Sequence, residues 1–237
     1  ISDSGGFQVM SLIHDQPELG NIDGDKIIFK LGGKKIILTP ESCIQLQLKI
    51  GADIIMCLDD CTHAEASLKE QKKSVERTIR WAGKCKIEFL KLTRNLKKKP
   101  LLFAIVQGGV NKKLRKYCAS KLLEIGFDGY SFGGFPVKDG KLMLNILEYV
   151  SSLIPDNKPK YAMGIGKPQD IVDCVKLGYN MFDCVIPTRD ARHKRFYVFT
   201  NKPTKKNILN KKFQAIYLRG KHKQDNKPIS KLCDCKT

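Results

Sequence analysis

Five short apolar runs alternate with stretches of helical periodicity along most of the chain, and this order limits the possible folds more than any other feature. The strand-like runs lie at 52–58, 101–106, 128–132, 160–163 and 181–185. Apolar residues recur with helical spacing between them, at 64–95, 111–125, 140–153 and 168–177. Continuous apolar strands separated by amphipathic helices predict an α/β fold with a parallel sheet covered on both faces.

Small or polar residues follow each strand-like run at its carboxyl end. These clusters are Asp59-Asp60, Gln107-Gly108-Gly109, Gly133-Gly134, Gly164-Ile165-Gly166 and the segment around Asp183. In a (β/α) barrel the functional groups converge at that end of the strands. A doubly wound open sheet has the same alternation, so element order alone leaves both architectures open. Candidate ligands after every strand favour the barrel.

The residues ahead of this alternation predict a hairpin and a helix. Strand-like segments at 26–30 and 35–38 flank Gly32-Gly33, which can supply the positive φ of a tight connection. Thr39 then precedes Pro40, the pattern of an N-cap with proline at the first helical position, and this helix is expected to end at Gly51.

The net charge indicates the kind of binding partner, and the distribution of cysteines indicates the cellular compartment. Lys and Arg number 43 against 24 Asp and Glu, a formal charge of +19, which suits a polyanionic partner; a lysine-rich host proteome explains it equally well. Most of the nine cysteines are scattered singly, as reduced thiols are in cytosolic proteins. No apolar run approaches the ~20 residues of a membrane span. We therefore predict a cytoplasmic protein with no membrane partner.

The polar clusters suit a purine-like ligand. Carboxylates such as Asp59 accept from ring and exocyclic N–H groups, while Gln107 and glycine N–H groups donate to a carbonyl. Phe7 offers a face for stacking. A second carboxylate pair, Asp3 and Asp183, would allow the division between nucleophile and acid/base that retaining glycosyl transfer uses.

Each cluster also has a purely structural interpretation. The paired glycines can be ordinary turns, and Asp60 is more readily read as a cap of the following helix than as a ligand contact. His63 reads as a loop residue. Taken alone, Asp183 reads as a turn residue followed by a solvated basic loop, and only its combination with the other carboxylates favours a functional role.

Six sequence blocks, in order over essentially the whole chain, resemble the signatures of the tRNA-guanine transglycosylases, also called queuine tRNA-ribosyltransferases. The blocks are Asp3-Ser-Gly-Gly-Phe-Gln, Leu58-Asp-Asp-Cys, Ile105-Val-Gln-Gly-Gly, Phe132-Gly-Gly, Met163-Gly-Ile-Gly and Phe182-Asp-Cys-Val-Ile-Pro-Thr-Arg. The resemblance implies a TIM (β/α)8-type barrel with a zinc-binding subdomain, in an enzyme that exchanges the wobble guanine of tRNA for a 7-deazaguanine.

The resemblance also implies roles for particular residues. Asp183 matches the nucleophile that holds a covalent ribose intermediate, and Asp3 matches the general acid/base. The residues that match the base-binding set are Asp59, Gln107 and Gly134, which read the purine edge, and Phe7 and Met163, which enclose its faces. The residues that match the grip on the anticodon-loop backbone are Arg189, Arg192, Lys194 and Arg195.

Two further cues concern the incoming base. Cys61 and Val137 resemble the bacterial form, which takes the aminomethyl-deazaguanine precursor, whereas Leu58-Asp59-Asp60 resembles the eukaryotic form, which takes queuine. Phe135-Pro136 departs from both patterns. The bacterial substrate is favoured, and the choice of base stays open.

The resemblance leaves parts of the family pattern outside this chain. Cys233 and Cys235 match the first two zinc ligands, and the third cysteine and the histidine have no counterpart. We expect residues 1–200 to form a barrel domain without its first strands and 201–237 a partial zinc subdomain, and such a piece to be unstable or inactive alone. Family members commonly dimerise, so a homodimer or heterodimer is expected. The rival hypothesis is a non-catalytic tRNA-binding partner subunit of the same fold.

Overall fold

A computed structural model of the protein describes residues 1–63, 65–138, 140–220, 224 and 227–232. Its centre is a five-stranded parallel sheet in the order β10-β9-β6-β5-β4. The strands are β4 (Ile54–Met56), β5 (Leu101–Val106), β6 (Gly129–Phe132), β9 (Lys160–Ala162) and β10 (Met181–Phe182). All five predicted strands are therefore confirmed, although the first is shorter than the predicted 52–58 and the last ends at residue 182 rather than 185.

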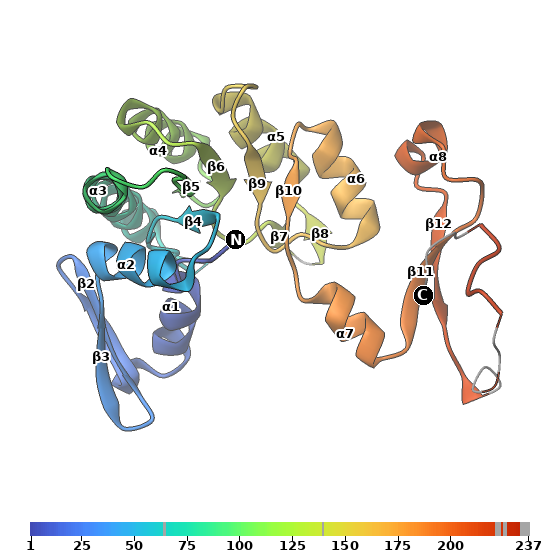
Figure 1. Ribbon diagram of the computed structural model, residues 1–237, viewed down its shortest axis with the longest axis horizontal. Coiled ribbons are helices and arrows are strands. Elements are labelled where there is room, and N and C mark those ends of the chain that lie inside the picture. Colours follow the sequence, from blue (N-terminus) through green and yellow to red (C-terminus); the bar gives the residue numbers. More distant parts are fainter. Residues whose placement is uncertain (64, 139, 221–223, 225–226, 233–237) are drawn as a thin grey trace.

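Helices connect successive strands and cover the outer side of this curled sheet (Figure 1). They are α3 (Leu68–Thr93), α4 (Lys112–Ile125), α5 (Leu144–Leu153) and α6 (Pro168–Lys176). The helix predicted from residue 140 begins only at Leu144, because the preceding residues form a small hairpin of β7 (Val137–Lys138) and β8 (Lys141–Leu142).

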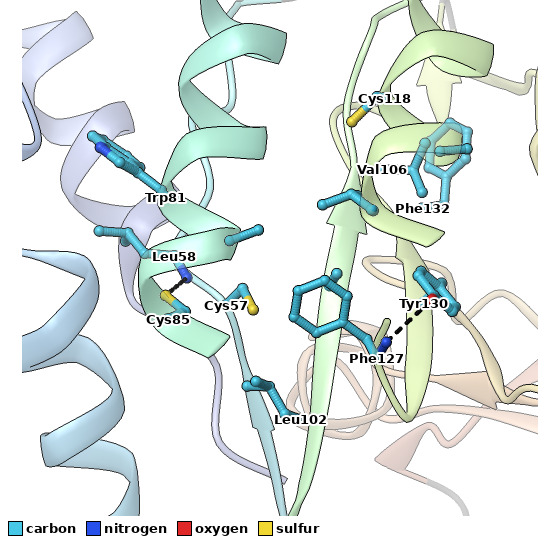
Figure 2. Packing of buried hydrophobic residues seen from close by; sticks show 14 of the residues in the cluster. Cys57, Leu58, Trp81, Cys85, Leu102, Val106, Cys118, Phe127, Tyr130 and Phe132 are labelled. Atoms are coloured by element: carbon cyan, nitrogen blue, oxygen red, sulfur yellow. Dashed lines mark hydrogen bonds between the residues drawn. The ribbon is translucent and has the colours of Figure 1, made fainter. Parts of the chain in front are cut away.

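Side chains alternate between the two faces of the sheet. In β5, Leu102, Ala104 and Val106 belong to the large core under the helices, whereas Phe103 and Ile105 belong to a smaller cluster on the other face. Figure 2 shows the outer core, where Trp81 of α3 and Cys118 of α4 pack with strand residues. Both faces of β5 are buried, which explains its continuous apolar sequence.

The cysteines in the described part of the chain are all free thiols, as predicted. Cys57, Cys85 and Cys118 are buried in the outer core, and burial raises the pKa of the Cys118 thiol to about 12. The Cys85 Sγ accepts a hydrogen bond from the Leu58 backbone N–H at 3.4 Å (Figure 2). These cysteines are packing residues.

The N-terminal region contains the predicted hairpin and helix and three elements that the sequence did not predict. The hairpin is β2 (Lys26–Leu31) with β3 (Lys34–Leu38), and β1 (Gly20–Asp23) adds a third antiparallel strand. The unpredicted helix α1 (Gly6–Asp15) and the 3₁₀ turn η1 (Pro17–Leu19) precede them. The helix α2 (Pro40–Ile50) begins as predicted, with Thr39 and Ser42 forming a reciprocal capping box.

The C-terminal region projects from the sheet as a helix and a two-stranded ribbon (Figure 1). Its elements are α7 (Ile186–Arg192), β11 (Arg195–Phe199), α8 (Lys205–Leu209) and β12 (Phe213–Tyr217). Strands β11 and β12 pair across the boundary predicted at residue 200, and the division into two domains stays a prediction. Among the described residues, no helix combines the length and apolar character needed to cross a bilayer.

Candidate active site

One cavity of ≈ 440 Å³ collects every residue that the sequence predicted to be catalytic or to bind a base. Those lining residues are Asp3, Phe7, Asp59, Gln107, Gly134, Met163 and Asp183. Five of them converge because the strands are parallel, so that the segments after β4, β5, β6, β9 and β10 leave the same edge of the sheet. Asp3 and Phe7 come instead from the N-terminal segment and the start of α1. The predicted assembly of these residues is confirmed, and their individual roles remain predictions.

Asp59 and Gln107 form the buried floor of this cavity. The Gln107 Nε2 donates a 2.6 Å hydrogen bond to the Asp59 Oδ2, and the Asp59 residue is only 4 % exposed. Burial raises the pKa of the Asp59 carboxyl to about 7, the Gln107 hydrogen bond opposes this, and the charges of Asp3 and Asp60 add to it. Near neutral pH this carboxyl can therefore either accept or donate a hydrogen bond.

The raised pKa of Asp59 predicts a pH-dependent stability. Between pH 4 and pH 7 the folded protein retains a proton that the unfolded chain has released, so the free energy of unfolding falls as pH rises through this window. The Asp59→Asn protein should not show this pH-dependent loss. At pH 8 its free energy of unfolding should exceed that of the unmodified protein by on the order of 3 kcal/mol. Denaturant unfolding at pH 5 and pH 8 measures the difference.

The matched control for this experiment is Asp53→Asn, because the Asp53 side chain is 84 % exposed and forms only a surface contact with Lys98. Its pH profile should follow that of the unmodified protein. If Asp59→Asn also follows the unmodified protein in parallel, the buried carboxyl does not hold a proton in the folded state at neutral pH.

The glycine pair after β6 is required by the approach of Gln107. A Cβ on Gly133 would lie 2.6 Å from the Gln107 Nε2, and Gly134 has a φ of +85°. The interpretation of these glycines as ordinary turn residues is therefore incomplete, since Gly133 also makes room for the amide of the cavity floor.

Two carboxylates stand exposed at the cavity, in contrast to the buried Asp59. The Asp183 Oδ1 accepts a hydrogen bond from the Gly164 N–H at 3.0 Å, so this carboxylate contacts the segment after β9 rather than capping its own turn. The Asp3 carboxylate accepts from the Ser4 N–H at 2.8 Å and from the Gln8 Nε2 at 3.2 Å. A parallel β-bridge between the backbones of Ser2 and Ile55 holds Asp3 beside β4.

Asp60 does not cap the following helix, so that prediction is wrong. The helix α3 begins at Leu68, and Ser67 with Glu70 forms its capping box. The Asp60 side chain is buried and forms an ion pair with Arg77 of α3. His63 lies in a loop as predicted, and its ring stacks on that of His14.

The four basic residues after Asp183 divide into two kinds. Arg189 lines the cavity, and Arg192 and Lys194 are exposed at the end of α7. Arg195 is partly exposed, with 36 % of its side chain accessible to solvent. Its guanidinium lies over the ring of Tyr197 at 5.2 Å, and its Nε is 3.8 Å from the Asp190 Oδ2 of α7. Arg195 therefore also has side-chain contacts within the protein, which the described residues do not show for Arg192 and Lys194.

Lys194 has a φ of +57°, a conformation that costs a side chain roughly 1 kcal/mol or more relative to glycine. Lys194→Gly is expected to raise the free energy of unfolding by about 0.5–1 kcal/mol, whereas Lys194→Ala keeps the strained backbone and should not. Both variants lose the cation. Thermal melting measures the backbone effect, and equal melting temperatures for the two variants would contradict it.

Some site predictions fall outside the cavity or outside the described residues. Cys61 and Pro136 line the cavity, whereas Val137 lies in β7 and is not among its lining residues. Cys233 and Cys235 lie outside the described residues, so their zinc site stays a prediction. Within the described ranges, no group of three or more metal-ligating side chains gathers.

Sequence analysis missed Arg115, a fully buried arginine of α4. Its guanidinium donates to the Gly109 and Val106 carbonyls and lies 4.3 Å from the centroid of the Phe132 ring. Burial lowers its pKa to about 10. A single arginine in an amphipathic helix gives no sequence signal of such a position, because only the tertiary fold brings α4 over the ends of β5 and β6.

The fold and the cavity together define an α/β protein with a carboxylate-lined pocket at the carboxyl edge of a parallel sheet. A family model described as queuine tRNA-ribosyltransferase matches residues 1–237, and the chain belongs to this family. The chain is 39 % identical to the queuine tRNA-ribosyltransferase of Idiomarina loihiensis and 40 % identical to that of Mannheimia succiniciproducens. All of this chain is matched in both, and it spans about 58 % of the length of these relatives.

Proposed function

We propose that the protein is a transglycosylase that exchanges a guanine of tRNA for a 7-deazaguanine. The observation that carries this proposal is the single cavity in which a buried carboxyl–amide pair and two exposed carboxylates meet. The family membership and the relatives named queuine tRNA-ribosyltransferase support it. The excess of positive charge, +19, suits a polyanionic substrate.

The proposed reaction passes through a covalent intermediate on Asp183. A carboxylate oxygen of Asp183 attacks the ribose anomeric carbon of the target nucleotide, and the bond to guanine breaks as the base leaves with a proton from Asp3. Asp3 then takes a proton from the incoming deazaguanine, whose nitrogen attacks the anomeric carbon and releases the Asp183 carboxylate. Two displacements retain the configuration of the sugar.

Base recognition is proposed for the remaining cavity residues. Asp59 would accept N–H groups of the purine edge, and Gln107 and the Gly134 N–H would donate to its carbonyl. Phe7 and Met163 would enclose the faces of the ring. The cavity volume of ≈ 440 Å³ is in the range typical of small-molecule pockets.

The anticodon loop is proposed to lie across α7. Arg189, Arg192 and Lys194 present cations there that would neutralise phosphates, while Arg195 would act through the packing of α7 against β11. We also propose that the curled sheet is part of a (β/α)8 barrel, that Cys233 and Cys235 help to hold a structural zinc ion, and that the protein works as a dimer in the cytoplasm.

A non-catalytic tRNA-binding subunit of the same fold is the second candidate. Such a subunit would not require the reactive carboxylates, and Asp3, Asp59 and Asp183 are all present around one cavity. This observation favours the enzyme. Neither candidate function specifies whether the incoming base is aminomethyl-deazaguanine or queuine. Competition of the two bases for incorporation into tRNA would identify it.

The experiment that tests the proposal is adduct formation with unmodified tRNA. Protein extended to the full length of the matched relatives, of which this chain spans about 58 %, is incubated with tRNA that carries the wobble guanine, and denaturing gels are searched for a protein–tRNA species that disappears when free base is added. Exchange of labelled guanine into the tRNA is measured in parallel. A protein that binds tRNA but gives neither adduct nor exchange would favour the non-catalytic subunit.

A further inference from the structure

Arg115 of α4 is a fully buried cation that takes part in none of the ion pairs of the described residues. Its guanidinium instead donates to two backbone carbonyls, from the Nε to the Gly109 oxygen at 2.8 Å and from the Nη1 to the Val106 oxygen. The ring of Phe132 lies against it, with the ring centroid 4.3 Å away. Burial of a charge without a carboxylate partner costs folding free energy, and an apolar side chain of similar size would avoid this cost. Packing alone therefore does not account for an arginine at this position.

The two carbonyls that Arg115 binds lie on either side of Gln107, the amide donor of the cavity floor. Val106 precedes Gln107 and Gly109 follows it by two residues, so the guanidinium spans the start of the loop after β5. The Cys118 Sγ lies on the same face of α4, one helical turn further along, and accepts a hydrogen bond from the Gln107 N–H at 3.4 Å. The helix α4 therefore fixes the backbone of Gln107 from both directions along the chain.

The same guanidinium also approaches the loop after β6. Phe132, whose ring it contacts, is the last residue of β6 and directly precedes Gly133 and Gly134. A Cβ on Gly134 would lie 3.7 Å from the Arg115 Nη2 and 3.5 Å from the Gln107 Oε1. One side chain thus lies against both loops that supply the proposed donors to the purine carbonyl, which are the Gln107 amide and the Gly134 N–H.

We propose that Arg115 is a positioning residue that sets the separation of the Gln107 amide and the Gly134 N–H, and thereby the preference of the cavity for a base with a carbonyl group. A guanidinium is planar and directs its N–H groups along fixed lines, so it can hold two carbonyl oxygens at a fixed separation, which the single ammonium group of lysine cannot. Donors held in place bind a carbonyl oxygen, and they are left unpaired against a base that lacks one. The inference rests on the proposed function, because it requires a purine in the cavity.

The test measures the equilibrium dissociation constants of guanine and of 2-aminopurine, which is guanine without its carbonyl oxygen, in protein extended to the length of the matched relatives. Arg115→Met should weaken guanine binding by about 5- to 10-fold, the contribution of roughly one hydrogen bond, and change 2-aminopurine binding little. The preference for guanine should therefore fall by the same factor. Arg115→Lys keeps the charge without the planar group and should lose the preference as well. The affinity for tRNA should stay near that of the unmodified protein, because phosphate contacts supply much of it.

The matched control is Lys160→Met, which also removes a buried cation that donates to a backbone carbonyl, the Ser151 oxygen at 3.0 Å. Lys160 begins β9, at the end of the sheet opposite the cavity, so this variant should keep the preference for guanine even if it melts early.

An undiminished preference for guanine in either Arg115 variant would overturn the inference and leave the proposed function intact. In the case of Arg115→Lys, the charge rather than the planar group would then be responsible. An unmodified protein that binds guanine no better than 2-aminopurine would instead overturn the proposed recognition of the base. If Arg115→Met melts early, Arg115→Lys alone provides the comparison.

Discussion

Replacing Asp183 by asparagine is expected to lower base exchange by on the order of 10⁴-fold or more and to abolish the covalent tRNA adduct. Asparagine keeps the size of the side chain and can still occupy the site beside the Gly164 N–H, which donates to the Asp183 Oδ1 at 3.0 Å. It lacks the anionic oxygen that would attack the ribose carbon. Losses of this size are usual when an enzyme's nucleophile is removed.

The measurements are single-turnover exchange of labelled guanine and adduct recovery on denaturing gels. Because Asp183 is exposed and takes part in none of the ion pairs of the described residues, the variant should melt at nearly the same temperature as the unmodified protein. Asp53→Asn again serves as the matched control, since it makes the same chemical change at a distant exposed site. An Asp183→Asn protein that still traps tRNA would exclude Asp183 as the nucleophile.

The second large effect is expected from a residue that carries no functional group. A Cβ on Gly166 would lie 1.7 Å from the Cys184 Sγ, a separation that two nonbonded atoms cannot adopt. Gly166→Ala must therefore rotate the Cys184 side chain, and the 2.9 Å separation from the Cys184 Cβ also requires the backbone beside Asp183 to shift. A displacement of about 1 Å in a reacting group can cost on the order of 10²-fold in rate, and we expect exchange to fall by about that factor.

A double-mutant cycle separates this displacement from a general loss of stability. Cys184→Ala removes the sulfur that the new methyl group would meet at 1.7 Å and leaves the milder contact of 2.9 Å with its Cβ. The double variant Gly166→Ala/Cys184→Ala should therefore recover part of the lost exchange. Gly83→Ala, where no heavy atom lies within 4 Å of the new Cβ, is the matched control. A double variant as impaired as Gly166→Ala would show that the sulfur contact is not the cause.

The main errors of sequence reasoning came from segments whose structure depends on distant contacts. The helix α1 was missed because Gly5 and Gly6 were read as a turn and its start has no side-chain cap. Its Gly6 packs against the segment after β4, where a Cβ would lie 2.9 Å from the Leu58 Cδ1. Asp60 was taken for a helix cap because it precedes a helical stretch, yet its partner Arg77 lies 17 residues further along.

The sequence by itself determined the order of strands and helices, because the spacing of apolar residues, the glycines and the capping residues all act on neighbours a few positions away in the chain. It also identified the cavity residues, because polar groups after parallel strands must meet at one edge. Only the tertiary structure decided how those groups differ: Asp59 is buried against Gln107, whereas Asp183 is exposed beside Gly164. The burial of a carboxyl, and therefore its pKa, depends on which segments pack against it, and these segments are distant in the sequence.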